Sequence, residues 1–134
     1  MAEVAARAGY DVVVRSRSQA GADAVYTGLD AGLLKQVARE KLTDEERQAI
    51  LGRITVTDDI SELALADLVI ESVVEDLAGK KALFAQLDEI VRPEAILATN
   101  TSTLPVVDLA MATKRPARRS RWKLIVAVKV RIVF

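Results

Sequence analysis

Apolar residues recur along the chain with two alternating spacings. In some segments every third or fourth position is apolar, which is helical spacing; between them lie short runs rich in β-branched residues, which is typical of strands. The predicted helices span residues 1–8, 19–41, 44–52, 60–64, 80–91 and 105–112. The predicted strands span residues 10–16, 53–57, 66–76 and 95–100. This alternation favours a doubly wound α/β fold with a parallel sheet.

Residues at the ends of several predicted helices support these boundaries. Thr43 and Glu46 match a capping box, in which hydroxyl and carboxylate each accept from a free backbone amide. Gly9 suits the position just after a helix, and Gly52 ends the helix that Thr43 begins. Pro105 suits a first helical position. The sequence therefore marks both the starts and the stops of its helices.

Composition narrows the class of protein. The 134 residues correspond in length to one domain, and 51% of them are hydrophobic, enough for a core. There is no Cys, which excludes disulfides and thiolate metal sites and suits a reducing cytoplasm, and there is no His. No apolar run approaches the ~20 residues that span a bilayer, and the start resembles no signal peptide. We expect a cytoplasmic protein with no metal site.

The net charge of zero conceals a basic carboxyl-terminal segment. Residues 114–134 contain eight Lys and Arg and no Asp or Glu, so the remaining chain is acidic. We therefore distinguish residues 1–116 from a basic, β-prone tail at residues 117–134.

Candidate chemistry lies where predicted strands end, because ligands of open α/β sheets bind beyond the carboxyl ends of the strands. Ser16 follows the first strand, Glu75 ends the third, and Asn100 and Ser102 follow the fourth. We expect these strand ends to converge on one nucleotide-sized crevice. Without further information, Asn100 and Ser102 would be a turn and a helix cap before Pro105.

Three stretches together carry a family resemblance. They are "DLVIESVVEDLAGKKALFAQLDEIV", "ILATNTSTLPVVDLA" and "ATKRP". With their spacing, they closely resemble the amino-terminal domain of 3-hydroxyacyl-CoA dehydrogenases, the bacterial 3-hydroxybutyryl-CoA dehydrogenases in particular. The resemblance covers residues 1 to about 116. It implies a Rossmann domain that binds NAD(P), a helical domain that closes over the acyl-CoA, reversible hydride transfer at the 3-carbon, and homo-oligomeric full-length relatives.

The resemblance also implies roles for single residues. Ser102 matches a serine that hydrogen-bonds the 3-oxygen of the substrate, and Asn100 matches an asparagine near the nicotinamide. Glu75 and Lys80 match residues on the nicotinamide side of the cofactor pocket, whereas Lys41 matches a lysine that meets CoA phosphates. The alternatives are ordinary: Glu75 and Lys80 as solvated charges at a helix start, and Lys41 as a favourable cation near a helix carboxyl end.

The sequence departs from the family in two segments. It contains no first strand with a G-x-G-x-x-G turn, which would hold the pyrophosphate. Residues 117–134 replace a family segment with a catalytic histidine, and the glutamate that orients it is also missing. We therefore expect an incomplete Rossmann-type sheet that does not hold its full native fold alone, and a fragment that is inactive alone. The abrupt change near Lys114 suggests a shifted reading frame as a hypothesis.

The turn after the first predicted strand bears on cofactor choice. Relatives that prefer NAD carry an acidic residue there, which accepts from the ribose hydroxyl. This chain has Ser16 between Arg15 and Arg17, so no carboxylate repels a 2′-phosphate and two guanidiniums can bind one. Between NAD and NADP, this turn favours NADP. The alternative is a solvated turn without a ligand.

Three interpretations of the basic tail stay open. It could be a strand that fills part of an open sheet edge, form an exposed edge that aggregates, or contact nucleic acid through its basic and aromatic residues. The third, which we favour least, would use Arg118, Arg119, Arg121 and Trp122. For the whole chain, the alternative to a dehydrogenase fragment is a non-catalytic nucleotide-binding or interaction remnant with a basic tail.

Overall fold

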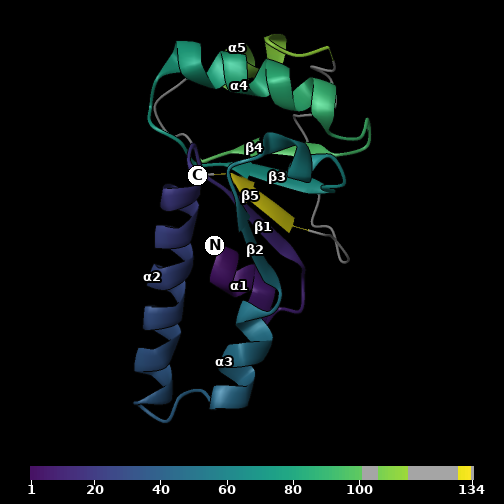
Figure 1. Ribbon diagram of the computed structural model, residues 1–134. Helices are drawn as coiled ribbons and strands as arrows, with labels where there is room; N and C mark the ends of the chain where they lie inside the picture. Colours follow the sequence, from purple (N-terminus) through teal and green to yellow (C-terminus); the bar gives the residue numbers. More distant parts are fainter. Residues whose placement is uncertain (101–105, 115–129, 134) are drawn as a thin grey trace.

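The fold is a five-stranded parallel sheet with helices on both faces (Figure 1). The structure, a computed structural model, describes residues 1–100, 106–114 and 130–133. The strands are β1 (Val12–Arg15), β2 (Ile54–Thr57), β3 (Leu68–Glu71), β4 (Ile96–Thr99) and β5 (Val130–Val133). The helices are α1 (Ala2–Arg7), α2 (Gln19–Val37), α3 (Asp44–Leu51), η1 (Ile60–Leu63), α4 (Leu77–Ile90) and α5 (Val106–Met111). The predicted α/β class is confirmed.

Strand β1 shows how both faces of the sheet are covered. Val12 and Val14 pack with buried residues of α1, α2 and α3, whereas Val13 between them packs with η1, α4 and α5. Successive side chains of a strand point to opposite faces, so the three valines belong to two separate cores. All three are buried. A continuous apolar run is what a strand covered on both sides requires.

The central position of the sheet is occupied by the carboxyl-terminal segment. The strand order is β2-β1-β5-β3-β4, and β5 pairs in parallel with β1 on one side and β3 on the other. In a Rossmann sheet this position belongs to the first strand. In the described sheet, Val130–Val133 of the tail occupy this position (Figure 1). Of the three interpretations of the tail, a strand in the sheet is confirmed for these residues, at its centre rather than at its edge.

Two elements end several residues before their predicted ends, each for a local reason. Helix α2 ends at Val37 rather than Lys41, and Glu40 adopts a left-handed backbone conformation with φ 56°. Strand β3 ends at Glu71 rather than Asp76, because the Glu71 carboxylate itself accepts from the backbone N–H of Val73. A side chain that bonds to its own backbone in this way competes with strand pairing.

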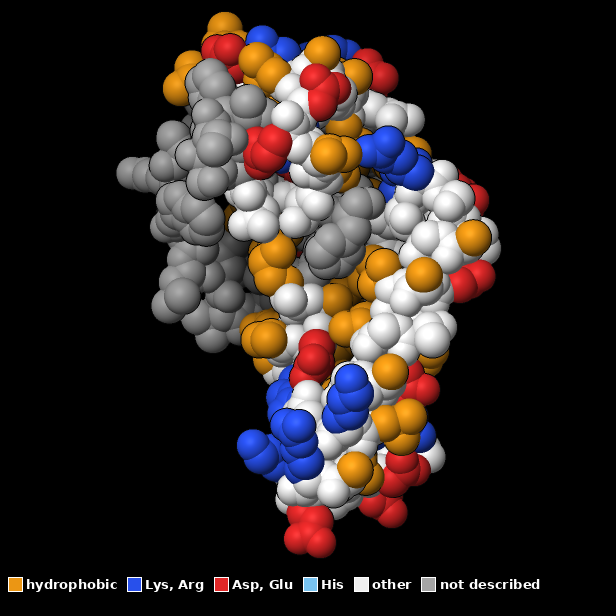
Figure 2. Space-filling model, turned by 90° about the vertical axis from the view of Figure 1, so that its left-hand side faces the viewer, with side chains coloured by type: hydrophobic (Ala, Val, Ile, Leu, Met, Phe, Trp, Pro, Cys, Tyr) orange, Lys and Arg blue, Asp and Glu red, His pale blue; other side chains and the backbone are white. Residues whose placement is uncertain are grey.

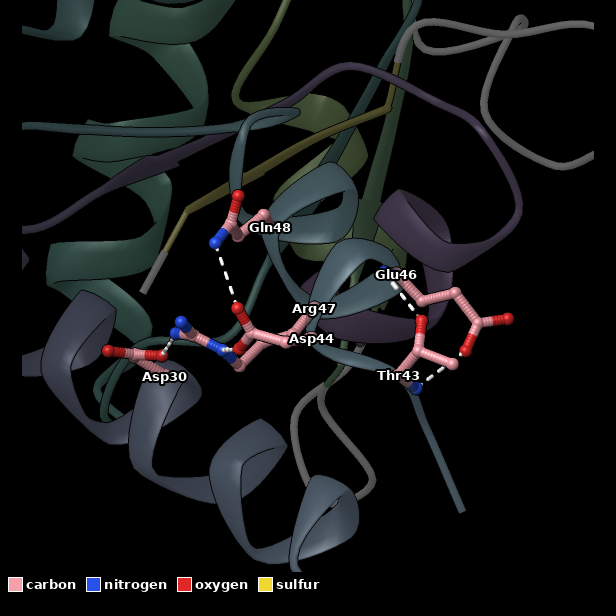
Figure 3. A network of polar contacts seen from close by, with 6 residues as sticks. All are labelled: Asp30, Thr43, Asp44, Glu46, Arg47 and Gln48. Carbon is pink, nitrogen blue, oxygen red and sulfur yellow. Dashed lines mark hydrogen bonds and ion pairs between the residues drawn. The ribbon is translucent and has the colours of Figure 1, made fainter. Parts of the chain in front are cut away.

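Helices α2 and α3 form a hairpin that projects from the sheet (Figure 1). The predicted capping box is confirmed: Thr43 Oγ1 accepts from the Glu46 amide at 3.1 Å, and the Glu46 carboxylate accepts from the Thr43 amide at 2.8 Å. Arg47 binds Asp30 of α2 and also Asp44 of its own helix, at 2.7 Å (Figure 3). Ion pairs and a helix cap thus stabilise the polar side of the hairpin.

The molecular surface is polar around this hairpin. Figure 2 shows Lys and Arg side chains beside Asp and Glu side chains over the lower part of the molecule, where α2 and α3 lie. Within residues 1–100, 106–114 and 130–133, none of the helices combines the length and the apolar character that crossing a membrane requires.

Candidate functional site

The candidate site is the carboxyl edge of the sheet, where four neighbouring strands end in register. Arg15 of β1 lies beside Val133 of β5, Val133 beside Glu71 of β3, and Glu71 beside Thr99 of β4. Since all these strands run in the same direction, the segments that follow them leave the sheet at the same edge. The three strand ends singled out in the sequence, at Ser16, Glu75 and Asn100, therefore share one edge of the molecule.

The end of β1 connects the sheet to α2. Ser16 donates its backbone N–H to the Thr57 carbonyl at 2.9 Å, and Ser18 caps α2 by accepting from the Gly21 amide at 3.2 Å. A Cβ in place of Gly21 would lie 2.6 Å from the Ser16 hydroxyl oxygen, so that hydroxyl would have to move. The Ser16 hydroxyl thus faces the first turn of α2. Arg17 is exposed.

A pocket of about 420 Å³ joins the end of β1 to the start of α4. Its lining includes three cationic side chains, those of Arg15, Arg17 and Lys80, and one carboxylate, that of Asp76. The rest of the lining is Val73, Val74, Gly79, Ala82, Leu83 and Gln86. Three of the residues predicted to bind a cofactor are thus brought together around one cavity with an excess of positive charge.

Lys80 is buried, which excludes its interpretation as a solvated charge at a helix start. Its side chain is 1% exposed, and its ammonium lies 3.2 Å from Glu71 Oε1 and 3.3 Å from Glu75 Oε1. Glu71 is fully buried, whereas the side chain of Glu75 is 44% exposed. A buried cation needs such partners, because an uncompensated charge in the interior is strongly unfavourable.

Glu71 also holds the end of β4. Thr99 Oγ1 donates to Glu71 Oε2 at 2.6 Å, and the Asn100 backbone N–H donates to the Glu71 carbonyl at 2.8 Å. The Asn100 side-chain amide donates to Ser72 Oγ at 3.3 Å. Asn100 is therefore fixed through both its backbone and its side chain to the segment after β3.

Sequence reasoning missed Glu71 and Thr99. Both lie inside predicted strands, where they were interpreted as parts of a strand rather than as site residues. A signal was available for Lys80 and its partner: Lys80 precedes Phe84 by four residues and Leu87 by seven, which places it on the buried face of α4. A lysine on a buried face predicts a nearby carboxylate.

Two predicted site residues are not placed at this edge by the described structure. Lys41 is exposed and follows α2, whose 19 residues begin at the edge and extend about 28 Å at 1.5 Å per residue. It therefore lies at the far end of the hairpin. Ser102 lies outside the described residues, as do Arg118, Arg119, Arg121 and Trp122.

One carboxyl group near the end of β2, that of Asp59, has a shifted pKa. The pKa of Asp59 is lowered from its ordinary value, chiefly because the Ser61 backbone N–H and hydroxyl donate to the carboxylate, with a smaller effect of Arg15. In the residues that the structure describes, no group of three or more Asp or Glu side chains could hold a metal ion.

Comparison with known proteins gives a consistent result. The sequence profile of the family "3-hydroxyacyl-CoA dehydrogenase, NAD binding domain" matches residues 1–123. A 3-hydroxybutyryl-CoA dehydrogenase of Mycobacterium tuberculosis is 44% identical over 119 residues, and a 3-hydroxyadipyl-CoA dehydrogenase of Escherichia coli is 42% identical over 118 residues. These matches cover 88% of this chain but only 42% and 25% of the two relatives.

Solved structures agree with the sequence matches. The crystal structure of Mycobacterium tuberculosis FadB2 superimposes with a TM-score of 0.85 at 44% identity, over 88% of this chain and 42% of that one. A (S)-3-hydroxybutyryl-CoA dehydrogenase of Ralstonia eutropha gives a TM-score of 0.84 at 30% identity, with the same coverage. The chain thus spans less than half the length of these relatives.

Proposed function

Since the chain belongs to the family of NAD-binding domains of 3-hydroxyacyl-CoA dehydrogenases, we propose that it is the nucleotide-binding part of an oxidoreductase. The reaction is hydride transfer between NAD(P) and a 3-hydroxyacyl-CoA or 3-oxoacyl-CoA, in fatty acid or butanoate metabolism in the cytoplasm, by a homo-oligomeric full-length enzyme. One observation carries the proposal most: the strand ends at Ser16, Glu75 and Asn100 share one edge, beside a cationic pocket.

Each site residue has a proposed task. The nucleotide, when bound, supplies or accepts the hydride. Asn100, held by Ser72 and Glu71, orients the nicotinamide end. Glu75 and Lys80 line the same side of the nucleotide. For Ser102 the proposal rests on the family resemblance, and its hydroxyl donates to the substrate's 3-oxygen as negative charge develops there.

Lys41 has a separate proposed task, on the substrate rather than on the nucleotide. It is exposed at the far end of the α2/α3 hairpin, about one helix length from the carboxyl edge. An ammonium at that distance suits the phosphates of an extended molecule such as CoA, whose thioester end would lie at the edge.

The pocket fits a nucleotide with an additional phosphate. Arg15 and Arg17 line it, and Arg15 donates from Nε to the Asp58 carbonyl at 3.2 Å, which leaves the rest of its guanidinium for a ligand. Guanidinium groups bind phosphate through paired hydrogen bonds, so these side chains suit the 2′-phosphate of NADP. We therefore propose a preference for NADP over NAD.

The test is a pair of titrations of the full chain with NADPH and NADH, followed by nicotinamide fluorescence. We expect NADPH to bind at least about tenfold more tightly, because hydrogen bonds between charged groups have free energies of that order. The variant Arg15→Gln/Arg17→Gln should bind NADPH only as tightly as NADH. Arg53→Gln is the matched control, since Arg53 is exposed and, within the described contacts, its side chain donates only to the Ala49 carbonyl. Tighter binding of NADH by the unmodified chain would refute the preference.

The second candidate is a non-catalytic nucleotide-binding or interaction remnant. The 134 residues contain no His to act as general base and no G-x-G-x-x-G turn to hold pyrophosphate, so neither candidate assigns catalysis to this segment by itself. Both candidates predict no turnover of acetoacetyl-CoA by this chain alone. They differ in the nucleotide titration: binding of neither NADPH nor NADH would favour a remnant with an interaction role.

A further inference from the structure

We propose that Glu71 is a positioning residue, a buried carboxylate that fixes the ends of β3 and β4 and the ammonium of Lys80 relative to one another. Its side chain is fully buried at the last position of β3. The consequence for nucleotide affinity rests on the proposed function. The consequence for the geometry of the edge is independent of the proposed function.

One carboxylate oxygen holds the end of β4. Glu71 Oε2 accepts from the Thr99 hydroxyl at 2.6 Å, while the Glu71 carbonyl accepts from the Asn100 amide at 2.8 Å. These two bonds involve consecutive residues of the neighbouring strand end. They fix the end of β4 and the position of Asn100, whose side-chain amide donates to Ser72 Oγ.

The other carboxylate oxygen holds the segment that follows β3. Glu71 Oε1 accepts from the Val73 amide at 2.6 Å and lies 3.2 Å from the Lys80 ammonium. Lys80 in turn lies 3.3 Å from Glu75. Through these contacts the Glu71 side chain positions the turn after β3, the start of α4 and Lys80, which also pairs with Glu75.

Stability alone does not account for two charged groups in this interior. Replacing a buried ion pair by apolar side chains of similar volume is often neutral or stabilising. Directional hydrogen bonds, in contrast, define positions that apolar packing leaves free, and a fully satisfied buried network is rigid. The three donors around the Glu71 carboxylate, on Thr99, Val73 and Lys80, make the network satisfied rather than strained.

The experiment compares three single variants and one double variant of the full chain. Thr99→Val removes the hydroxyl that Glu71 accepts from, and Thr99→Ser retains it. Thr57→Val is the matched control, because Thr57 also ends a strand at this edge and the substitution removes one hydrogen bond, which the Thr57 hydroxyl oxygen accepts from the exposed Asp59 amide. Glu71→Met/Lys80→Met replaces both buried charges. The measurements are hydrogen exchange of the Asn100 amide, NADPH affinity and the unfolding midpoint.

We expect Thr99→Val to accelerate exchange of the Asn100 amide and to weaken NADPH binding, each by about tenfold, because hydrogen bonds to charged groups have free energies of that order. Thr99→Ser and Thr57→Val should stay within about twofold of the unmodified chain, as is usual for changes that leave no buried group unsatisfied. The double variant removes both charges but also the acceptor of the Thr99 hydroxyl and the Val73 amide, so it should unfold at a lower temperature. Its Asn100 amide should exchange faster than this loss of global stability accounts for, which a purely structural role would not produce.

Two results would overturn the proposal. One is an Asn100 exchange rate in Thr99→Val that equals the rate in Thr57→Val. The other is a folded double variant whose Asn100 amide is as protected as in the unmodified chain. If the unmodified chain binds no NADPH, the proposed function fails instead, and the exchange measurements still decide the role of Glu71.

Discussion

The hairpin and the carboxyl edge each contain one basic side chain between two carboxylates, yet the two groups differ in exposure. In the hairpin, the Arg47 side chain is 17% exposed and binds Asp30 and Asp44, whose side chains are 34% and 51% exposed. At the edge, Lys80 lies between Glu71, which is fully buried, and Glu75. The same ionic chemistry therefore occurs once next to water and once in the protein interior.

This difference in exposure indicates different roles for the two groups of charged side chains. A solvated ion pair contributes little free energy and is screened by salt, so it is a small addition to a helix that other forces hold. A buried charge is retained against a desolvation cost, and its removal leaves a partner uncompensated. Exposure, rather than the number of ion pairs, therefore identifies the edge as the candidate site.

The largest expected effect tests the buried group. Lys80→Met should lower the free energy of unfolding by about 3–5 kcal/mol, because it leaves the Glu71 carboxylate without its cation in the interior. Chemical denaturation of the purified chain measures it. Lys81→Met is the neighbouring control: Lys81 is 41% exposed, pairs with Asp108 at 3.5 Å, and should cost at most about 1 kcal/mol.

Equal losses for Lys80→Met and Lys81→Met would break the comparison. They would mean that burial does not distinguish the two lysines in solution, and that Glu71 is compensated from elsewhere. An intermediate loss would sharpen it, because the hydrogen bonds from the Thr99 hydroxyl and the Val73 amide would then compensate part of the Glu71 charge.

A second large effect tests the strand on which the edge depends. Ile132→Pro should cost about 3 kcal/mol or more, because β5 is paired on both sides and proline removes a ladder hydrogen bond. Ile132→Val keeps the backbone donor and a β-branched residue, so it should cost much less than Ile132→Pro. Denaturation followed by circular dichroism distinguishes them. If Ile132→Pro unfolds like the unmodified chain, β5 does not hold β1 and β3 together.

Much of the fold could be predicted from the sequence, since local signals specify local structure. The capping box at Thr43 and Glu46, the glycine after α1 and the apolar face of α4 are each visible within a few residues. The alternation of strands and helices was sufficient for the fold class. The family followed from three motifs, and the profile match to residues 1–123 confirms it.

What could not be predicted depends on contacts between distant segments. The place of Val130–Val133 depends on pairing with β1 and β3, two strands distant in the sequence, which the sequence of the tail does not reveal. Likewise, Thr99 is 28 residues from Glu71, and a threonine within an apolar strand has no local feature that indicates its partner. The strand ends in the sequence indicated the edge, whereas no feature of the sequence indicated that the Glu71 side chain connects them.

A moderate effect tests the capped end of the hairpin. Thr43→Ala should lower the free energy of unfolding by about 1 kcal/mol, because it leaves the Glu46 amide without an acceptor at the start of α3. Thr43→Ser retains the hydroxyl and should recover most of this loss. Thermal unfolding of the three proteins gives the ranking. A Thr43→Ala protein as stable as the original would show that α3 is held by packing alone.

The smallest expected effect depends on pH and tests the exposed network. The pKa of Asp44 is lowered from its ordinary value, first by the hydrogen bond from Arg47, and the pKa of Arg47 is raised in turn. A carboxyl whose pKa is lower in the folded state stabilises the fold above its unfolded pKa, about 4. That contribution is lost as the pH falls through the lowered value. Asp44→Asn should therefore differ from the unmodified chain at neutral pH and approach it in acid.

The variant Arg47→Met assigns this pH dependence to its cause. Without the guanidinium, the pKa of Asp44 should rise toward its ordinary value, which a carbon-detected NMR titration of the Asp44 carboxyl would follow. Added salt should reduce the same shift in the unmodified chain, because exposed charges are screened. The stability effects of Lys80→Met should be far less sensitive to salt, since Lys80 is 1% exposed. If salt changed both networks to the same extent, water would reach the edge as freely as the hairpin, and the difference in exposure would not explain their different roles.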